Sequence, residues 1–178
     1  MRLYTNGCSF VWGDELEDRG NEAFPFLLKD RLGCELINES RRGSSNQRIL
    51  RTTLARKFEK DTFVIIGWSS IYRYEYHVDG IPYQTGPRDG AKFRVIKDLE
   101  EEWFIVNFLN QVLALQNHLK YHNIPFFFFL SFTGASIDGG LFDLVDKETF
   151  PSLFNNDLVF RDYCINNGAL MTKGFNGH

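Results

Sequence analysis

The stretch TFVII, residues 62–66, decides the fold because it is a β-branched apolar run without polar alternation that ends at Gly67-Trp68. Continuous apolar runs of this kind are typical of strands buried on both faces, as in a parallel sheet. A second such run, FFFFLSF, follows Pro125, and shorter strand patterns cover Arg2–Thr5 and Cys34–Asn38. The sequence therefore predicts four strands, of which two are buried and the one over residues 62–66 is central.

Segments with helical spacing separate these strands. Ala23–Leu32 has apolar residues at the helical period and stops at Gly33, the residue type favoured just past a helix end. A second helix is expected after a cap provided by Ser44 or Ser45. The longest helical pattern covers Leu99–Tyr121.

Residues 71–94 interrupt this order with an aromatic, polar and Gly/Pro-rich excursion, in which Asp79-Gly80 is a hairpin signal. Toward the C-terminus the patterns weaken; they predict a helix over Lys147–Phe154 and irregular structure over Asn166–His178. Alternation of strands and helices favours right-handed crossovers between parallel strands. We therefore expect one α/β domain over residues 1–178, a three-layer α/β/α sandwich with a parallel central sheet.

Charge and cysteine content narrow the function. The net charge of −3, with no basic tract longer than a pair, disfavours nucleic acid as a partner. Cys8, Cys34 and Cys164 lie far apart and form no C-x-x-C pair, which disfavours a disulfide framework and a zinc site and favours a reducing, cytoplasmic location. The sequence encodes no standard signal for secretion or for spanning a membrane.

Small polar residues follow three of the predicted strands. The first strand leads into Gly7-Cys8-Ser9-Phe10, the second into residues 38–46 (NESRRGSSN), and the third into Gly67-Trp68-Ser69-Ser70. In a parallel sheet these carboxyl ends meet at one edge, where ligands bind. A serine at such a strand end can attack a carbonyl carbon while nearby N–H groups stabilise the oxyanion, provided that a base takes the hydroxyl proton.

These three stretches, GCSF…GDEL, NESRRGSSNQRI and IIGWSS, resemble the first three blocks of the SGNH (GDSL-type) hydrolases, particularly the compact versions in bacteriophage genomes. The resemblance covers roughly residues 1–75. It implies an SGNH/flavodoxin-like fold, Ser9 as the nucleophile and Gly43 as a backbone oxyanion donor. In the family's third block an Asn side chain donates to the oxyanion; Ser69 and Ser70 align there, so a hydroxyl replaces the amide.

Four histidines are candidates for the base. His118 and His122 share a helical face but lack the Glu of an H-E-x-x-H pattern, so we expect no metal site there. His77 lies in the aromatic excursion. His178 is the strongest candidate, because the resemblance places the base in a late loop, commonly as Asp-x-x-His.

The region before His178 departs from that pattern. Phe175 stands three residues before it and Asn176 two before it, so the expected carboxylate is absent. Three explanations stay open: a reduced Ser9–His178 pair, a sequence that continues beyond His178 in the parent gene, or a site that has lost activity.

Other residues around the predicted edge have alternative roles. Ser9 could simply cap a following helix, and Asn46 could either brace the second loop or join Ser69 in holding the oxyanion. Trp68, Tyr72 and Arg73 could bind substrate, although aromatic clusters often only pack and arginines are often only solvated. Arg73, with Arg41 and Arg42, could recognise an acidic substrate.

The function expected from this pattern is a serine esterase that removes a short acyl group, such as acetyl, from a carbohydrate or small-molecule ester. It requires no metal or organic cofactor, nucleic acid or membrane. The alternative is a catalytically silent SGNH-like protein used for binding or assembly, encoded for example by a phage. A flavodoxin-like nucleotide binder would have the same layer order, but the chain lacks a glycine-rich phosphate loop.

Overall fold

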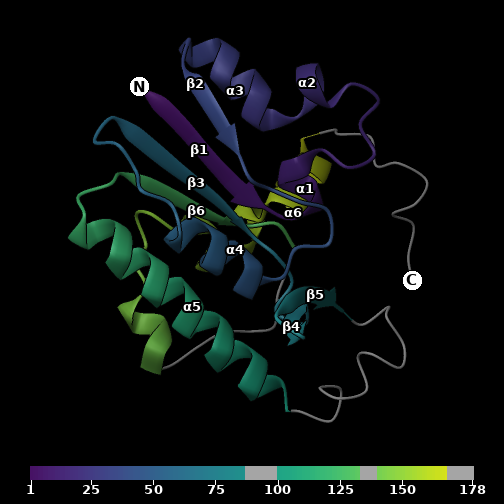
Figure 1. Cartoon of the computed structure of the whole chain (residues 1–178), viewed down its shortest axis with the longest axis vertical. Coiled ribbons are helices and arrows are strands. Elements are labelled where there is room, and N and C mark those ends of the chain that lie inside the picture. The colour runs from purple at the N-terminus through teal and green to yellow at the C-terminus, as the bar shows by residue number, and fades with distance from the viewer. Residues whose placement is uncertain (87–99, 133–139, 168–178) are drawn as a thin grey trace.

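The computed structural model of the chain describes residues 1–86, 100–132 and 140–167. Its centre is a parallel sheet of four strands in the order β2-β1-β3-β6 (Figure 1). The strands are β1 (Arg2–Gly7), β2 (Glu35–Asn38), β3 (Thr62–Trp68) and β6 (Phe126–Leu130). All four predicted strands are confirmed, and β1 and β3 each continue two residues further than predicted.

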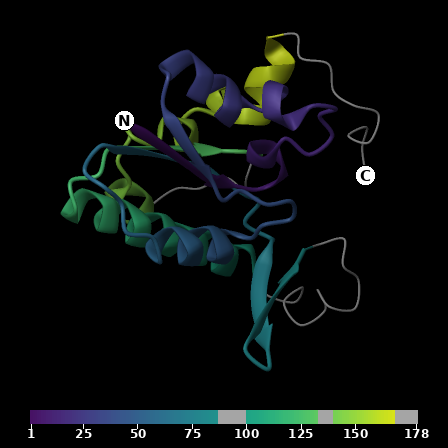
Figure 2. The ribbon, with the colours of Figure 1, turned by 45° about the horizontal axis from the view of Figure 1, so that its top comes forward.

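Helices cover both faces of this sheet, which confirms the three-layer architecture. Figure 2 shows α4 and α5 on one side of the sheet, and α1, α3 and α6 on the other. The helices are α1 (Ser9–Trp12), α2 (Arg19–Glu22), α3 (Phe24–Leu32), α4 (Asn46–Leu54), α5 (Glu101–Tyr121) and α6 (Phe160–Asn166).

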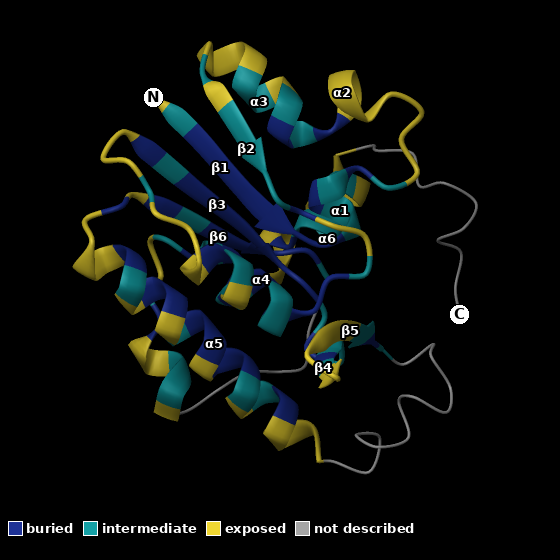
Figure 3. Cartoon of the chain, in the orientation of Figure 1, coloured by how far each residue is buried: buried dark blue, intermediate teal, exposed yellow. Residues whose placement is uncertain are grey.

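Alternate residues of the strands feed two separate cores. Tyr4, Ile66 and Phe128 point toward α4 and α5, where they pack with Ile49 and with the apolar stripe of α5 that includes Phe108. On the opposite face a smaller core holds Leu3, Val11, Ile65 and Phe129, with Phe24 and Phe160 against it. Figure 3 shows that β1 and β3 are largely buried and that the outer faces of the helices are exposed, whereas β2 has no buried residue. Period-two side-chain alternation on a sheet covered on both sides accounts for the continuous apolar runs in the sequence.

Two predicted helix ends are confirmed. Gly33 ends α3 in the left-handed conformation with φ +57°, and its N–H bonds back to the last turn. Of the two predicted caps, Ser45 is the one used, because its hydroxyl accepts from the Arg48 N–H at 3.2 Å.

The excursion contains a β-hairpin that projects from the layered body (Figure 2). Its strands β4 (Tyr74–Val78) and β5 (Ile81–Thr85) are antiparallel and join at Asp79-Gly80, both with positive φ, as the sequence predicts. Residues 87–94 of the predicted excursion lie outside the described residues.

Polar contacts fix this hairpin to α4. Arg51 donates two hydrogen bonds to the buried Glu75 carboxylate, at 2.8 and 3.0 Å, and Gln84 donates a third at 2.6 Å. Gln84 in turn accepts from the Ser45 N–H at 2.7 Å. The hairpin is therefore anchored beside the loop that follows β2.

The helix predicted over Lys147–Phe154 is wrong. That segment holds a turn at Asp146, whose carboxylate accepts from the Glu148 N–H at 2.9 Å, followed by the short 3-10 helix η3 (Pro151–Leu153). Two further 3-10 helices are η2 (Gly140–Leu144) and η4 (Asn156–Leu158). Within the described ranges, no helix is both long and apolar enough to cross a membrane.

Candidate active site

Ser9 lies at the carboxyl end of β1, where the chain turns into α1. It is the first helical residue and is half-buried, whereas Cys8 before it is completely buried and occupies the cap position. Ser9 is therefore not the helix cap. Within the described part of the chain, neither its hydroxyl nor its N–H has a hydrogen-bond partner, and the first N–H groups of a helix have none inside the helix.

Two glycines allow α1 to lie this close to the sheet. A Cβ on Gly67 would clash with Cγ2 of Val11 and lie 2.7 Å from Cζ of Phe129. A Cβ on Gly7 would meet the same Val11 methyl and lie 2.8 Å from the carbonyl oxygen of Gly67. Gly7 and Gly67 pair in the sheet, and because neither has a side chain, Val11, two residues beyond Ser9, packs directly against their backbone. We call this pair of glycines the glycine seat.

The loop after β2 runs alongside Ser9. The Arg41 N–H donates to the Gly7 carbonyl at 3.1 Å, and the Arg42 guanidinium lies 3.1 Å from the Asp14 carboxylate just beyond α1. Between them and α4, Gly43 takes φ +71°, a conformation that favours glycine. Its N–H has no acceptor among the described residues, so it is available as a donor.

Asn46 joins the loops that follow β2 and β3. Its side chain is buried; Oδ1 accepts from the Ser69 N–H at 2.8 Å, and Nδ2 donates to the carbonyls of Ser69 at 3.1 Å and Ser70 at 3.4 Å. Because its amide donors are engaged in this way, the expectation that Asn46 could hold an oxyanion is corrected. Asn46 is the brace that sets the position of Ser69.

Arg73 holds the hydroxyl of Ser69 in place. Its Oγ accepts from Nη1 of Arg73 at 3.0 Å, which leaves its own proton to donate elsewhere. A hydroxyl that accepts from a cation is also a stronger donor, because neighbouring hydrogen bonds polarise one another. Ser69 can therefore act as the hydroxyl donor that the sequence predicts.

Phenylalanine rings border this edge of the sheet. The ring of Phe132 touches that of Phe10 edge-on, with centroids 4.7 Å apart, and lies under the Arg73 guanidinium at 5.3 Å. The ring centroids of Phe10 and of Phe160, at the start of α6, lie 6.0 Å apart. Sequence reasoning did not identify Phe132 or Phe160; for Phe132, its place just after β6 was an available signal.

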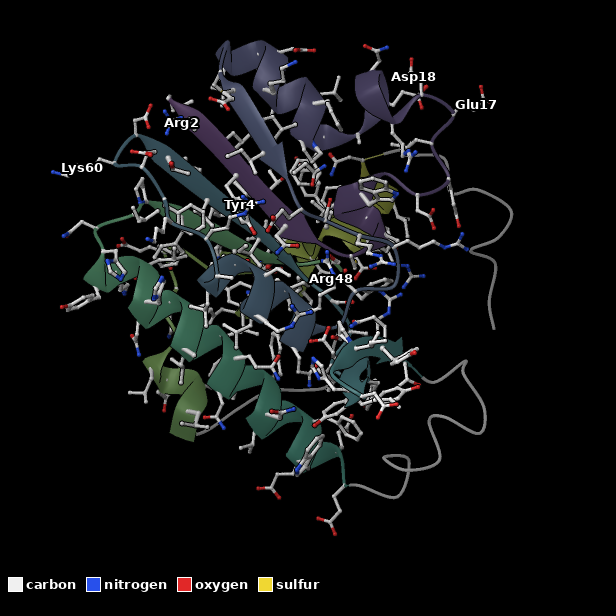
Figure 4. All side chains as sticks on the ribbon, in the orientation of Figure 1. Arg2, Tyr4, Glu17, Asp18, Arg48 and Lys60 are labelled. Carbon is white, nitrogen blue, oxygen red and sulfur yellow. The ribbon has the colours of Figure 1, made fainter. Side chains whose placement is uncertain are left out.

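A buried polar network supports the end of β1 from the α4 side. Asn6 donates to Thr52 at 2.8 Å and Thr53 at 3.0 Å on α4 and accepts from the Gly7 N–H at 2.9 Å. The Tyr4 hydroxyl donates to Glu39 at 2.8 Å, and burial holds the pKa of Tyr4 far above its usual value. Figure 4 shows Tyr4 on β1 and Arg48 on α4, the helix that this network joins to the sheet.

Trp68 and Tyr72, two residues predicted to contact the substrate, differ in their burial. Trp68 is completely buried and packs edge-on against Phe108 at 5.8 Å and Phe128 at 5.6 Å, so it belongs to the core and its predicted place in a substrate wall is wrong. The Tyr72 hydroxyl donates to Glu101, which raises the pKa of Tyr72 to about 12. The half-buried ring of Tyr72 stays a predicted substrate contact.

None of the histidines in the described ranges approaches Ser9. His118 and His122 lie at the C-terminal end of α5, next to the turn that leads into the start of β6 and hence at the opposite edge of the sheet. His77 is exposed on the hairpin. His178, with Phe175 and Asn176, lies outside the described residues, so its role stays a prediction. The described residues contain no group of three or more side chains able to hold a metal ion.

A model of a family of unknown function, DUF6071, matches residues 13–139. The chain belongs to this family. The DUF6071 match includes Gly43, Asn46, Ser69 and Arg73, and begins just after Ser9. No curated protein matches the sequence.

Among solved structures, this DUF6071 chain is similar to two proteins of the G-D-S-L family. One, from Desulfitobacterium hafniense DCB-2, is 12% identical with a TM-score of 0.45; the match covers 95% of this chain and 74% of the other. The second, a member of the lipolytic protein G-D-S-L family from Veillonella parvula DSM 2008, is 10% identical with a TM-score of 0.40, and the match covers 93% and 73%.

Proposed function

We propose that this chain is a serine ester hydrolase with Ser9 as its nucleophile. The observation that carries the proposal is the set of free donors at one edge of the sheet. They are the hydroxyl and N–H of Ser9, the N–H of Gly43 and the hydroxyl of Ser69.

These donors suit acyl transfer. The Ser9 oxygen would bond to the acyl carbon, and the carbonyl oxygen would accept from the N–H groups of Ser9 and Gly43 and from the Ser69 hydroxyl while it carries negative charge. Losing one such donor costs about 2.7–4 kcal/mol of transition-state stabilisation. The ester C–O bond then breaks, the alcohol leaves with a proton, and water releases the acid from Ser9.

The base in this scheme is His178, which would take the Ser9 proton and return it to the leaving alcohol. The reaction needs no metal or organic cofactor. The substrate class that we propose is a short acyl ester, such as an acetyl group on a carbohydrate or small molecule. An origin in a bacteriophage genome stays a prediction of the sequence resemblance.

Hydrolysis of 4-nitrophenyl acetate tests the proposal. Ser9→Ala is expected to lose the activity. Ser70→Ala changes a neighbouring serine whose hydroxyl accepts from the Tyr72 N–H at 3.4 Å, and it is expected to retain the activity. Equal rates for wild type and Ser9→Ala would remove Ser9 from the mechanism.

A catalytically silent binding or assembly protein is the second candidate. It is favoured by the surroundings of Ser9, because no described histidine or carboxylate forms a hydrogen bond with its hydroxyl. A fluorophosphonate probe separates the two functions. Labelling of Ser9 supports the enzyme, and folded protein that stays unlabelled supports the binding protein.

A further inference from the structure

The guanidinium of Arg73 is held at the same edge of the sheet as Ser9. It is half-buried, donates to the Ser69 hydroxyl at 3.0 Å and lies 5.3 Å above the ring of Phe132. These two contacts fix the direction of the planar group. They satisfy only one of its five N–H donors.

Arg73 lacks a counter-ion in the described part of the chain, where no carboxylate lies within 4.0 Å of it. Three acidic groups near this edge are each paired with a different arginine. The pairs are Asp14 with Arg42, Glu39 with Arg56, and Glu75 with Arg51. Because a partly buried cation is costly unless it is paired, the site favours a ligand that brings its own negative charge.

The position of Arg73 relative to Ser9 limits where that charge can lie. The Phe132 ring contacts both Arg73 and Phe10, the neighbour of Ser9. Ser69, which Arg73 contacts directly, is also a proposed oxyanion donor. A group bound to the free guanidinium nitrogens would therefore lie close to an ester carbonyl in front of Ser9.

We propose, building on the proposed function, that Arg73 makes the site selective for esters that carry a carboxylate near the scissile bond. Arginine presents a planar fork of N–H donors that matches a carboxylate with two parallel hydrogen bonds. Its contact with Ser69 orients that fork, and the aromatic ring beneath it limits its movement. The guanidinium thus binds the carboxylate of the substrate and positions the Ser69 hydroxyl.

Pairs of esters that differ only in the carboxylate test this inference. One pair is monoethyl succinate against ethyl butyrate, and the other is 3-acetoxybenzoate against methyl 3-acetoxybenzoate, with hydrolysis followed by titration of the released acid. The readout is the ratio of kcat/KM for the charged and neutral members. Wild type is expected to favour the charged member of at least one pair by about tenfold or more, as a charge-assisted hydrogen bond allows.

Arg73→Gln is expected to remove this preference, and Arg73→Lys to restore part of it by keeping the charge. Arg31→Gln is the matched control, because Arg31 is an exposed arginine in the last turn of α3, before β2 begins at the opposite edge of the sheet. It is expected to leave the ratio unchanged. A ratio that is the same in wild type and Arg73→Gln for both pairs would overturn the inference.

Binding to the Ser9→Ala variant separates this inference from the proposed function. Calorimetric titration with monoethyl succinate is expected to show binding that is lost when Arg73→Gln is added. Such binding without any hydrolysis by wild type would overturn the proposed function and support the role of Arg73. Ser9-dependent hydrolysis with no effect of Arg73 on the ratio or on binding would do the reverse.

Discussion

Gly67→Ala tests the idea that a glycine seat positions Ser9. The new methyl would clash with Val11 Cγ2 and lie 2.7 Å from Phe129 Cζ. Val11 is fully buried, and a β-branched side chain in a helix has one strongly preferred rotamer, so it cannot turn aside. Overpacking of this kind costs about 1–3 kcal/mol, and we expect α1 to lift from the sheet.

A double-mutant cycle with Val11→Ala measures this contact. Val11→Ala alone removes two buried methyl groups, which costs about 2 kcal/mol when the cavity is included. In the double variant the clash with Val11 is gone, so the combined loss is expected to be smaller than the sum of the single losses by about 1 kcal/mol. Urea unfolding with unchanged m-values gives each free energy of unfolding.

Gly20→Ala is the control for the backbone effect of replacing glycine, since Gly20 is exposed on α2 and a Cβ there meets only Asp18 Oδ1 at 3.4 Å. It is expected to be neutral or slightly stabilising. Single losses at Gly67 and Val11 that add to within about 0.3 kcal/mol would refute the seat. If the contact of Val11 with Gly67 positions Ser9, Gly67→Ala is also expected to lower kcat/KM, because small displacements of a reacting group are costly.

Two further predictions concern the surroundings of the site, and a third concerns the C-terminal end of α5. Asn46→Ala leaves the Ser69 N–H and carbonyl without their partner and is expected to lower the free energy of unfolding by about 2–4 kcal/mol in urea; a loss below about 0.5 kcal/mol would contradict the brace. Glu75→Ala releases the hairpin from α4 and is expected to cost about 1–3 kcal/mol and to speed proteolysis within β4 or β5, whereas unchanged proteolysis would contradict the anchoring. The hydrogen bond from the Lys120 ammonium lowers the pKa of Asp146 from its ordinary 3.8. The wild type is therefore expected to be more stable than Asp146→Asn at neutral pH, and this difference is expected to shrink as the pH falls through the folded-state pKa. A difference that persists in strong acid would contradict this pairing.

The sheet and the long helices could be predicted from the sequence because their patterns are local and repeated. A continuous apolar run such as residues 62–66 can only be satisfied by burial on both faces, and the 21-residue helix α5 repeats its stripe through several turns. Four-residue helices such as α1 and α2 contain about one turn, so no period can be detected in them. Pro151 marks the start of a 3-10 turn, which periodicity alone does not distinguish from a helix.

The sequence predicted the site from the ends of the strands. The wrong predictions arose because the sequence alone does not show where each side chain points. Trp68 was placed at the rim because it follows Gly67, but β3 continues through Trp68, which pairs with Leu130 and follows Val64 and Ile66 onto the α4 and α5 face. The strand therefore ends one residue before Ser69. Asn46 had two open roles in the sequence, and only the positions of the Ser69 amide and carbonyl decide between them.

The most direct test of the account is to locate the acyl group during turnover. Wild-type protein would be mixed with 4-nitrophenyl acetate, quenched in acid and digested, and the peptide that contains Cys8 and Ser9 would be sequenced by mass spectrometry. One acetyl group is expected on the Ser9 oxygen of the wild type, and none is expected on Ser9→Ala. An acetyl group found only on Cys8, which is buried in this structure, or a protein that turns over the ester with Ser9 unmodified at every quench time, would contradict it.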